Sequence, residues 1–107
     1  MIEKGNLSDD EKRKFMESFL EKLSGLEDVS SKKMFGGYGL FYKGKMFGMI
    51  TAKGGAYLKA DDSNIEDYLA LNSSKHSRMP YYEIPDEIFN NDKLLISWVQ
   101  KSMDLVH

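Results

Sequence analysis

Residues 34–59 read MFGGYGLFYKGKMFGMITAKGGAYLK, and this stretch decides the fold because short apolar runs alternate in it with glycine at turn spacing. KGK at residues 43–45 predicts one hairpin turn, and KGG at residues 53–55 predicts a second. The runs around these turns predict four strands, over residues 29–35, 38–43, 46–52 and 56–59. Connections this short allow only antiparallel pairing, so we expect a meander.

The chain on both sides of these strands has the periodicity of helices. Ser8 and Glu11 have the spacing of a capping box, and apolar side chains recur behind them at helical intervals. They predict a helix over about residues 8–24. Ser63 and Glu66 repeat the capping-box spacing and predict the start of a second helix.

The last third of the chain predicts one more strand and two helical segments. Residues 79–84 form a short run with a proline near its start, which an edge strand allows. Pro85 suits the first position of a helical turn over 85–90, and Asn90 or Asn91 is expected to cap a final helix. The buried side of that helix is expected to contain Leu94, Leu95, Trp98, Val99, Met103 and Val106.

Strands that follow one another, rather than alternating with helices, indicate an α+β protein. The predicted order is helix, three or four strands, helix, strand, helix. The predicted architecture has two layers, with an antiparallel sheet and helices on one face. A chain of 107 residues has the length of one domain, and we expect a single domain over residues 1–107.

The composition excludes several classes of protein. Cysteine is absent, which excludes disulfides, thiolate metal sites and a cysteine nucleophile. No stretch approaches the ~18 apolar residues of a membrane span, and the first ten residues lack the apolar run of a signal peptide. We therefore expect a soluble cytoplasmic protein that does not contact membranes.

Charge is distributed unevenly along the chain, although the net charge is only −2. Residues 29–80 carry eight basic and four acidic side chains, and residues 29–60 contain no Asp or Glu. Both flanking segments are net negative. Such a bias can give a weakly acidic protein one positive face.

The sequence predicts no catalytic, metal or cofactor site. The glycine-rich motif at residues 34–39 fits neither phosphate-binding pattern and leads into a strand rather than a helix. His76 and His107 lack the neighbouring ligands that zinc requires. We interpret the motif residues as structural: Met34, Phe35, Gly36, Gly37, Tyr38 and Gly39. The protein is therefore expected to bind partners and not to be an enzyme.

The predicted strands combine basic and aromatic side chains, as binding surfaces do. If helices cover one face only, strand alternation leaves Phe41, Phe47 and Met49 on the other, where an apolar patch indicates a protein contact. The candidate surface residues are Lys32, Lys33, Phe41, Lys43, Lys45 and Phe47. If this face pairs with itself, the protein is a homodimer. Lysines among aromatic rings are also typical of surfaces that bind nucleic acid, which is an alternative to a protein contact. Binding of a small molecule is a third possibility for this domain.

Residues 34–40, 44–50 and 57–60, in this order, resemble the N-terminal domain of the TfoX/Sxy family, as do residues 79–85 and the final helix around Trp98. The resemblance implies a two-layer α+β fold similar to that of type III secretion chaperones. It also implies a bacterial regulator of transcription in natural competence, which assists the cyclic-AMP receptor protein and has no catalytic residues. Full-length members carry a second, helical domain, so we expect this chain to be a stand-alone N-terminal domain.

The leading hypothesis from the sequence is a binding module that regulates transcription through contacts with a protein partner. Direct, weak contact with nucleic acid through the lysine-rich sheet is the first alternative. The weakly acidic balance of the whole chain argues against a strong, autonomous DNA-binding protein, which is usually basic. A small-molecule-binding domain is the second alternative.

Overall fold

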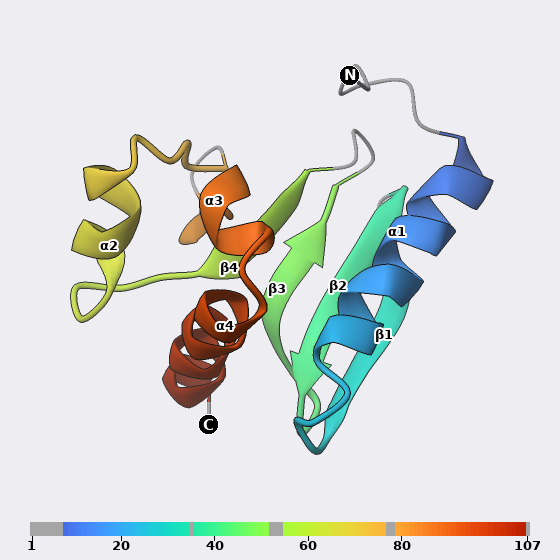
Figure 1. Ribbon diagram of the computed structural model, residues 1–107. Helices are drawn as coiled ribbons and strands as arrows, with labels where there is room; N and C mark the ends of the chain where they lie inside the picture. The colour runs from blue at the N-terminus through green and yellow to red at the C-terminus, as the bar shows by residue number, and fades with distance from the viewer. Residues whose placement is uncertain (1–7, 35, 52–54, 77–78, 107) are drawn as a thin grey trace.

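The computed structural model describes residues 8–34, 36–51, 55–76 and 79–106, and the strands in it form one five-stranded antiparallel sheet in the order β1-β2-β3-β4-β5 (Figure 1). Sheet order therefore follows chain order. The elements are α1 (Asp9–Lys22), β1 (Val29–Met34), β2 (Gly37–Tyr42), β3 (Lys45–Ile50), β4 (Ala56–Lys59), α2 (Ile65–Ala70), β5 (Tyr81–Glu83), α3 (Asp86–Phe89) and α4 (Asp92–Val106). The predicted α+β class with an antiparallel sheet is confirmed.

One face of the sheet and the helices share a core. Residues directly opposite one another on neighbouring strands point to the same face. The register places Gly48 between Leu40 and Leu58, and Tyr82 lies opposite Leu58 on the next strand. These strand residues pack with apolar side chains from each of the described helices: Phe19, Leu23, Tyr68, Ile88, Leu95 and Val99. In Figure 1, α1, α3 and α4 lie over this face of the sheet, as predicted.

The first helix begins with the predicted capping box. The Glu11 N–H donates to Ser8 Oγ at 3.1 Å, and the Ser8 N–H donates to Glu11 Oε1 at 3.2 Å. The helix ends at Lys22, slightly before the predicted end. It ends there because the last turn tightens, and the Leu23 N–H donates to the Leu20 carbonyl three residues back.

The hairpin predicted at KGK has the expected backbone. Lys43 (φ 50°) and Gly44 (φ 83°) both have positive φ, as a two-residue turn of type I′ requires. Tyr42 and Lys45 form the strand pair that closes this turn. Phe35 and residues 52–54 lie outside the described residues. They include most of the predicted KGG turn and the last residue of two predicted strands.

A β-bulge in β3 moves Phe47 to the helix side of the sheet. Leu40 lies opposite Gly48, but the next residue, Phe41, lies opposite Met46, so Phe47 is an extra residue in β3. The extra residue reverses the alternation of side chains, and Phe47 is 0% exposed in the core. The prediction that Phe47 is exposed beside Phe41 was wrong, because simple alternation does not anticipate a bulge.

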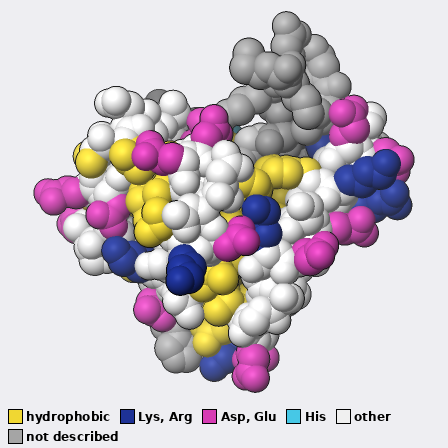
Figure 2. Space-filling model, in the orientation of Figure 1, with side chains coloured by type: hydrophobic (Ala, Val, Ile, Leu, Met, Phe, Trp, Pro, Cys, Tyr) yellow, Lys and Arg dark blue, Asp and Glu magenta, His cyan; other side chains and the backbone are white. Residues whose placement is uncertain are grey.

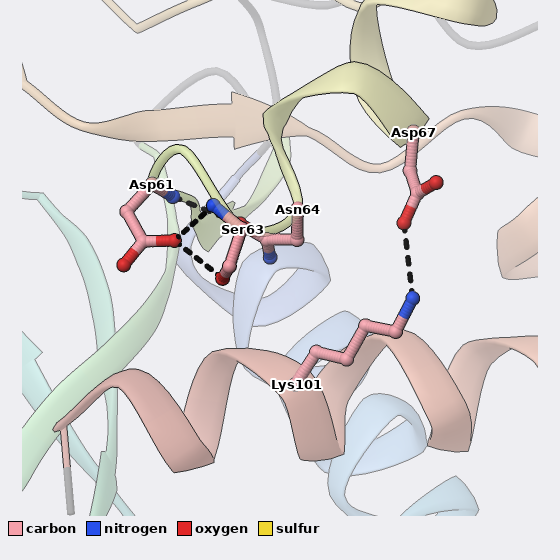
Figure 3. A network of polar contacts seen from close by, with 5 residues as sticks. All are labelled: Asp61, Ser63, Asn64, Asp67 and Lys101. Carbon is pink, nitrogen blue, oxygen red and sulfur yellow. Dashed lines mark hydrogen bonds and ion pairs between the residues drawn. The ribbon is translucent and has the colours of Figure 1, made fainter.

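The loop before α2 is stabilised by local hydrogen bonds rather than by the predicted capping box at Ser63 (Figure 3). The N–H and the hydroxyl of Ser63 donate to Asp61 Oδ1 at 2.8 and 2.6 Å, and the Asp61 N–H donates to Asn64 Oδ1 at 2.8 Å. Ser63 does not cap the helix, because α2 begins at Ile65 and Asn64 occupies the N-cap position. Its two hydrogen bonds lower the pKa of the Asp61 carboxyl. Nearby, Lys101 Nζ lies 3.0 Å from Asp67 Oδ2 and joins α4 to α2.

The C-terminal part of the fold differs from the prediction in three details. Pro85 occupies the N-cap position, and α3 begins one residue later. Asn91 caps α4 as predicted, because the Leu94 N–H donates to Asn91 Oδ1 at 3.2 Å. Leu94 lies on the solvent side of this first turn and is 43% exposed instead of buried, whereas the adjacent Leu95 is 0% exposed. The strand predicted over 79–84 shortens to Tyr81–Glu83.

Tyr68 of α2 is buried together with its hydroxyl group. Its ring centroid lies 4.6 Å from that of Trp98 and 5.6 Å from that of Tyr82. The hydroxyl has no partner in hydrogen-bonding geometry among the described residues, and the neighbouring Ser102 hydroxyl donates to the Lys59 carbonyl at 2.8 Å. Burial raises the pKa of Tyr68, because a phenolate would be poorly solvated there.

We predict that Tyr68→Phe leaves the free energy of unfolding at neutral pH unchanged or raises it by about 1 kcal/mol, since it removes a buried, unpaired polar group. The raised pKa makes the folded protein hold the Tyr68 proton more tightly than the unfolded chain does. Wild-type stability should therefore fall as the pH rises above the ordinary tyrosine pKa of about 10, and the variant should lose less. Urea unfolding at neutral and alkaline pH measures both effects. A clearly destabilised variant at neutral pH would show that the hydroxyl is bonded.

Gly37 lies where no side chain fits. A Cβ at this position would lie 1.9 Å from the Ile50 carbonyl oxygen, which belongs to the backbone and cannot rotate away. We predict that Gly37→Ala lowers the free energy of unfolding by about 3 kcal/mol or more. Gly25→Ala is the matched control, because a Cβ there meets nothing within 4 Å. Its effect in chemical denaturation should stay below about 1 kcal/mol, and equal effects of the two substitutions would contradict the geometry.

Candidate binding face

The face of the sheet opposite the helices carries a cluster of thioether and aromatic side chains centred on Gly39. A Cβ at Gly39 would lie 2.6 Å from Met34 Sδ and 3.1 Å from Met46 Sδ. It would lie 2.9 Å from Cε1 of Phe41. Met49 lies opposite Gly39 in the register and points to the same side. We call Met34, Phe41, Met46 and Met49 the methionine face.

The methionine face forms because Gly39 has no side chain. Side chains from β1, β2 and β3 lean over the glycine, so Gly39 is buried beneath them while each of them stays half-buried. Methionine is unbranched and polarisable, so its side chain adapts to surfaces of different shape. The described helices pack against the other face of the sheet. The result is an adaptable apolar surface.

Towards β5 the same face becomes more polar. Tyr57 lies opposite Met49, and Glu83 lies opposite Tyr57. The His76 ring lies 5.0 Å from the Tyr57 ring, measured between centroids. The apolar part of the face is therefore confined to the first three strands.

Tyr81 ties the polar end to the methionine face. Its side chain is buried, and its hydroxyl donates to the Met46 carbonyl at 3.2 Å. Burial raises the pKa of Tyr81, which keeps the hydroxyl protonated and able to donate. Because β5 pairs with β4 and Met46 belongs to β3, this bond crosses β4 and holds the two ends of the face in a fixed relation.

The candidate lysines do not share one surface. Lys32 lies opposite Gly39 and therefore on the same side of the sheet as the methionine face, whereas Lys33 lies opposite Tyr38 on the helix side. Lys43 lies in the hairpin turn, where its Nζ is 5.3 Å from the ring centroid of the preceding tyrosine. The side chains of Lys32 and Lys33, which are neighbours on β1, therefore point to opposite faces of the sheet.

Of the predicted surface residues, Phe41 belongs to the methionine face and Lys32 lies beside it on the same side of the sheet. The others lie elsewhere: Phe47 in the core, Lys33 on the helix side, Lys43 in the turn and Lys45 beside the end of α4. The structure therefore brings only part of the predicted surface together. The rest of the apolar surface is formed by Met34, Met46 and Met49.

The glycine-rich motif has both structural and surface roles. Gly36 has a positive φ of 77° between β1 and β2, and Gly37 lies against the β3 backbone. These two positions have the structural role that the sequence predicted. Gly39 and Met34, in contrast, build the methionine face. Phe35 lies outside the described residues.

Sequence reasoning missed Lys12, which holds the turn before the methionine face. This lysine is only 8% exposed, and its Nζ donates to the Gly36 carbonyl at 2.6 Å. A signal was present, because Lys12 precedes Met16 by four residues and so lies in line with the apolar stripe of α1. A lysine in a buried stripe indicates a specific polar partner.

A shallow hollow of about 490 Å³ lies where the start of β3 and the end of β4 meet the last turn of α4. It is lined by Lys45, Met46, Lys59, Leu105 and Val106. α4 has no basic residue in its last turn, and Lys45, which lies beside that turn, adds positive charge of the kind that a helix C-terminus favours.

The helix-bearing side has a different surface. Figure 2 shows acidic and basic side chains interspersed over it, with apolar atoms between them. Within the described ranges, no helix is long and apolar enough to cross a membrane. In the same ranges, no three His, Asp or Glu side chains are grouped so that they could hold a metal ion.

The geometry defines an open-faced α+β protein, in which helices cover one face of an antiparallel sheet and thioethers line the other. The TfoX N-terminal domain family matches residues 21–105, and the chain belongs to that family. The resemblance inferred from the sequence motifs is thereby confirmed. The chain has no match among curated proteins.

We predict that Gly39→Ala rearranges the methionine face without unfolding the protein. The added methyl group would meet the flexible ends of side chains, at 2.6 Å for Met34, rather than backbone as at Gly37. The loss of stability should therefore be about 1–2 kcal/mol. In NMR spectra the methyl resonances of Met34 and Met46 should shift, whereas that of Met103, which is buried in the core, should not. Unchanged resonances at the first two positions would contradict the cluster.

Proposed function

We propose that this protein is a non-enzymatic binding module that regulates transcription in the cytoplasm, in a competence-type role, through contacts with a protein partner. The observation that carries the proposal is the methionine face. Its half-buried thioethers and Phe41 present apolar surface to water, and burial of such surface against a partner is favourable. Membership of the TfoX N-terminal domain family supports the link to transcription.

Direct binding of nucleic acid is the competing function, and one observation favours it: residues 29–60 contain no acidic residue. The lysines of this segment are dispersed, however, because Lys32 and Lys33 point to opposite faces and Lys45 lies beside α4. Single-stranded nucleic acid requires a continuous basic groove with several stacking rings. On this side of the sheet Phe41 belongs to the methionine face, Tyr57 lies on β4 beside Met49, and the Tyr81 side chain is buried. These rings do not follow a continuous line of lysines. We therefore rank protein binding first.

The test is an affinity purification from native bacterial extract, with mass spectrometry as the readout. Tagged wild type, Phe41→Asp and the control Lys14→Glu are compared with and without nuclease. Lys14 is exposed on α1, on the other side of the protein. We expect wild type and Lys14→Glu to enrich a transcription activator or RNA polymerase. This enrichment should survive nuclease and should be lost with Phe41→Asp.

Three outcomes decide between the functions. Enrichment that disappears with nuclease would identify nucleic acid as the direct partner and overturn the proposal. Equal enrichment by Phe41→Asp would show that the methionine face is not the binding surface. An empty purification with folded wild type would remove the support for a transcription partner. Thermal unfolding of both variants first establishes that they are folded.

A further inference from the structure

We propose that the methionine face binds one acidic amphipathic helix of its partner. This inference rests on the proposed function, protein binding through that face, and specifies the chemistry of the partner. Three features carry it: the width of the apolar strip, the lysines that flank it, and the like charges that a second copy would bring to the interface.

The apolar strip has the width of one helix. Met34, Phe41 and Met46 come from β1, β2 and β3, which are neighbours in the sheet. Neighbouring strands lie about 4.8 Å apart, so the strip is roughly 10 Å across. An α-helix with its side chains has a diameter of roughly 10–12 Å. One helix can therefore lay an apolar stripe along the strip, as amphipathic helices do in apolar grooves.

Lysines flank this strip on both sides. Lys32 lies on the edge strand β1, and the register places Lys59 on the same face of β4. Neither ammonium group forms an ion pair with a carboxylate of the described residues. The positive charge of Lys59 contributes to lowering the pKa of Asp61, which lies two residues along the chain. A helix with carboxylates on both sides of its apolar stripe would place negative charge near both lysines.

The same charges disfavour a second copy of this protein as the occupant. Two methionine faces packed together would bring Lys32 and Lys59 of both copies into one interface. Among the described strands, Glu83 is the acidic residue that the register places on this face, and it lies at the β5 end, away from β1. Like charges brought together at an interface lower the affinity. We therefore expect a different protein on this face.

A peptide-display selection tests the inference with a random library as the probe. Peptides of about 16 residues, long enough for a helix, are selected on wild type after removal of sequences that bind Phe41→Asp. We expect the enriched peptides to be acidic and to carry apolar residues at helical spacing. Reversal of both flanking charges, Lys32→Glu with Lys59→Glu, should weaken their binding by about tenfold or more. The matched control, Lys14→Glu with Lys93→Glu, changes exposed helix residues and should alter affinity less than about twofold.

Several outcomes would overturn the inference. Enriched peptides that are neutral or basic would do so, and so would a failure to enrich any peptide that distinguishes wild type from Phe41→Asp. Sedimentation showing a dimer that Phe41→Asp dissociates would identify a second copy as the occupant.

Failure of this inference can be told from failure of the proposed function. If the affinity purification captures a partner through Phe41 but the selected peptides are not acidic, only the chemistry of the partner is wrong. If Phe41→Asp leaves the purification unchanged, protein binding through this face fails as a whole.

Discussion

One extra residue in β3 sets the two faces of the sheet. Because Phe47 has no residue opposite it on β2, the strand reverses which of its side chains face the helices. Phe47 enters the core, and Met46 turns to the open side, where it joins the cluster over Gly39. With regular alternation the core would lose a fully buried ring and the open face would gain one. The bulge therefore determines both the packing of the helices and the chemistry of the binding face.

The open face depends on the absence of a side chain at Gly39 as much as on the side chains that lie over it. From the sequence, strand alternation placed Phe41 and Met49 on this face, and the structure has both there. The contacts of Met34 and Met46 over Gly39 could not be predicted, because they join three strands and depend on the pairing register. The sequence motif drew attention to Gly39 only as one of several structural residues, and the register shows which side chains fill the space above it.

The parts of the fold that could be predicted depend on a few neighbouring residues. The capping box at Ser8, the KGK hairpin and the Asn91 cap are of this kind, and the structure contains all three. The predicted cap at Ser63 is absent because α2 begins at Ile65, so that Asn64 is the N-cap residue and Ser63 lies one position too early. The prediction for Phe47 was wrong for a different reason. A bulge depends on the pairing of two strands, so the pattern of one strand does not reveal it.

The agreement between sheet order and chain order has a consequence for how the protein folds. Each of the first three pairings joins strands that are consecutive in the chain, so each closes a short loop and loses little chain entropy. Proteins rich in such local pairings fold faster than those that depend on distant ones. β5 differs, because α2 separates it from β4. We therefore expect the hairpins of β1 to β4 to form early in folding, so that the open face of the sheet is paired before α4 covers the opposite side.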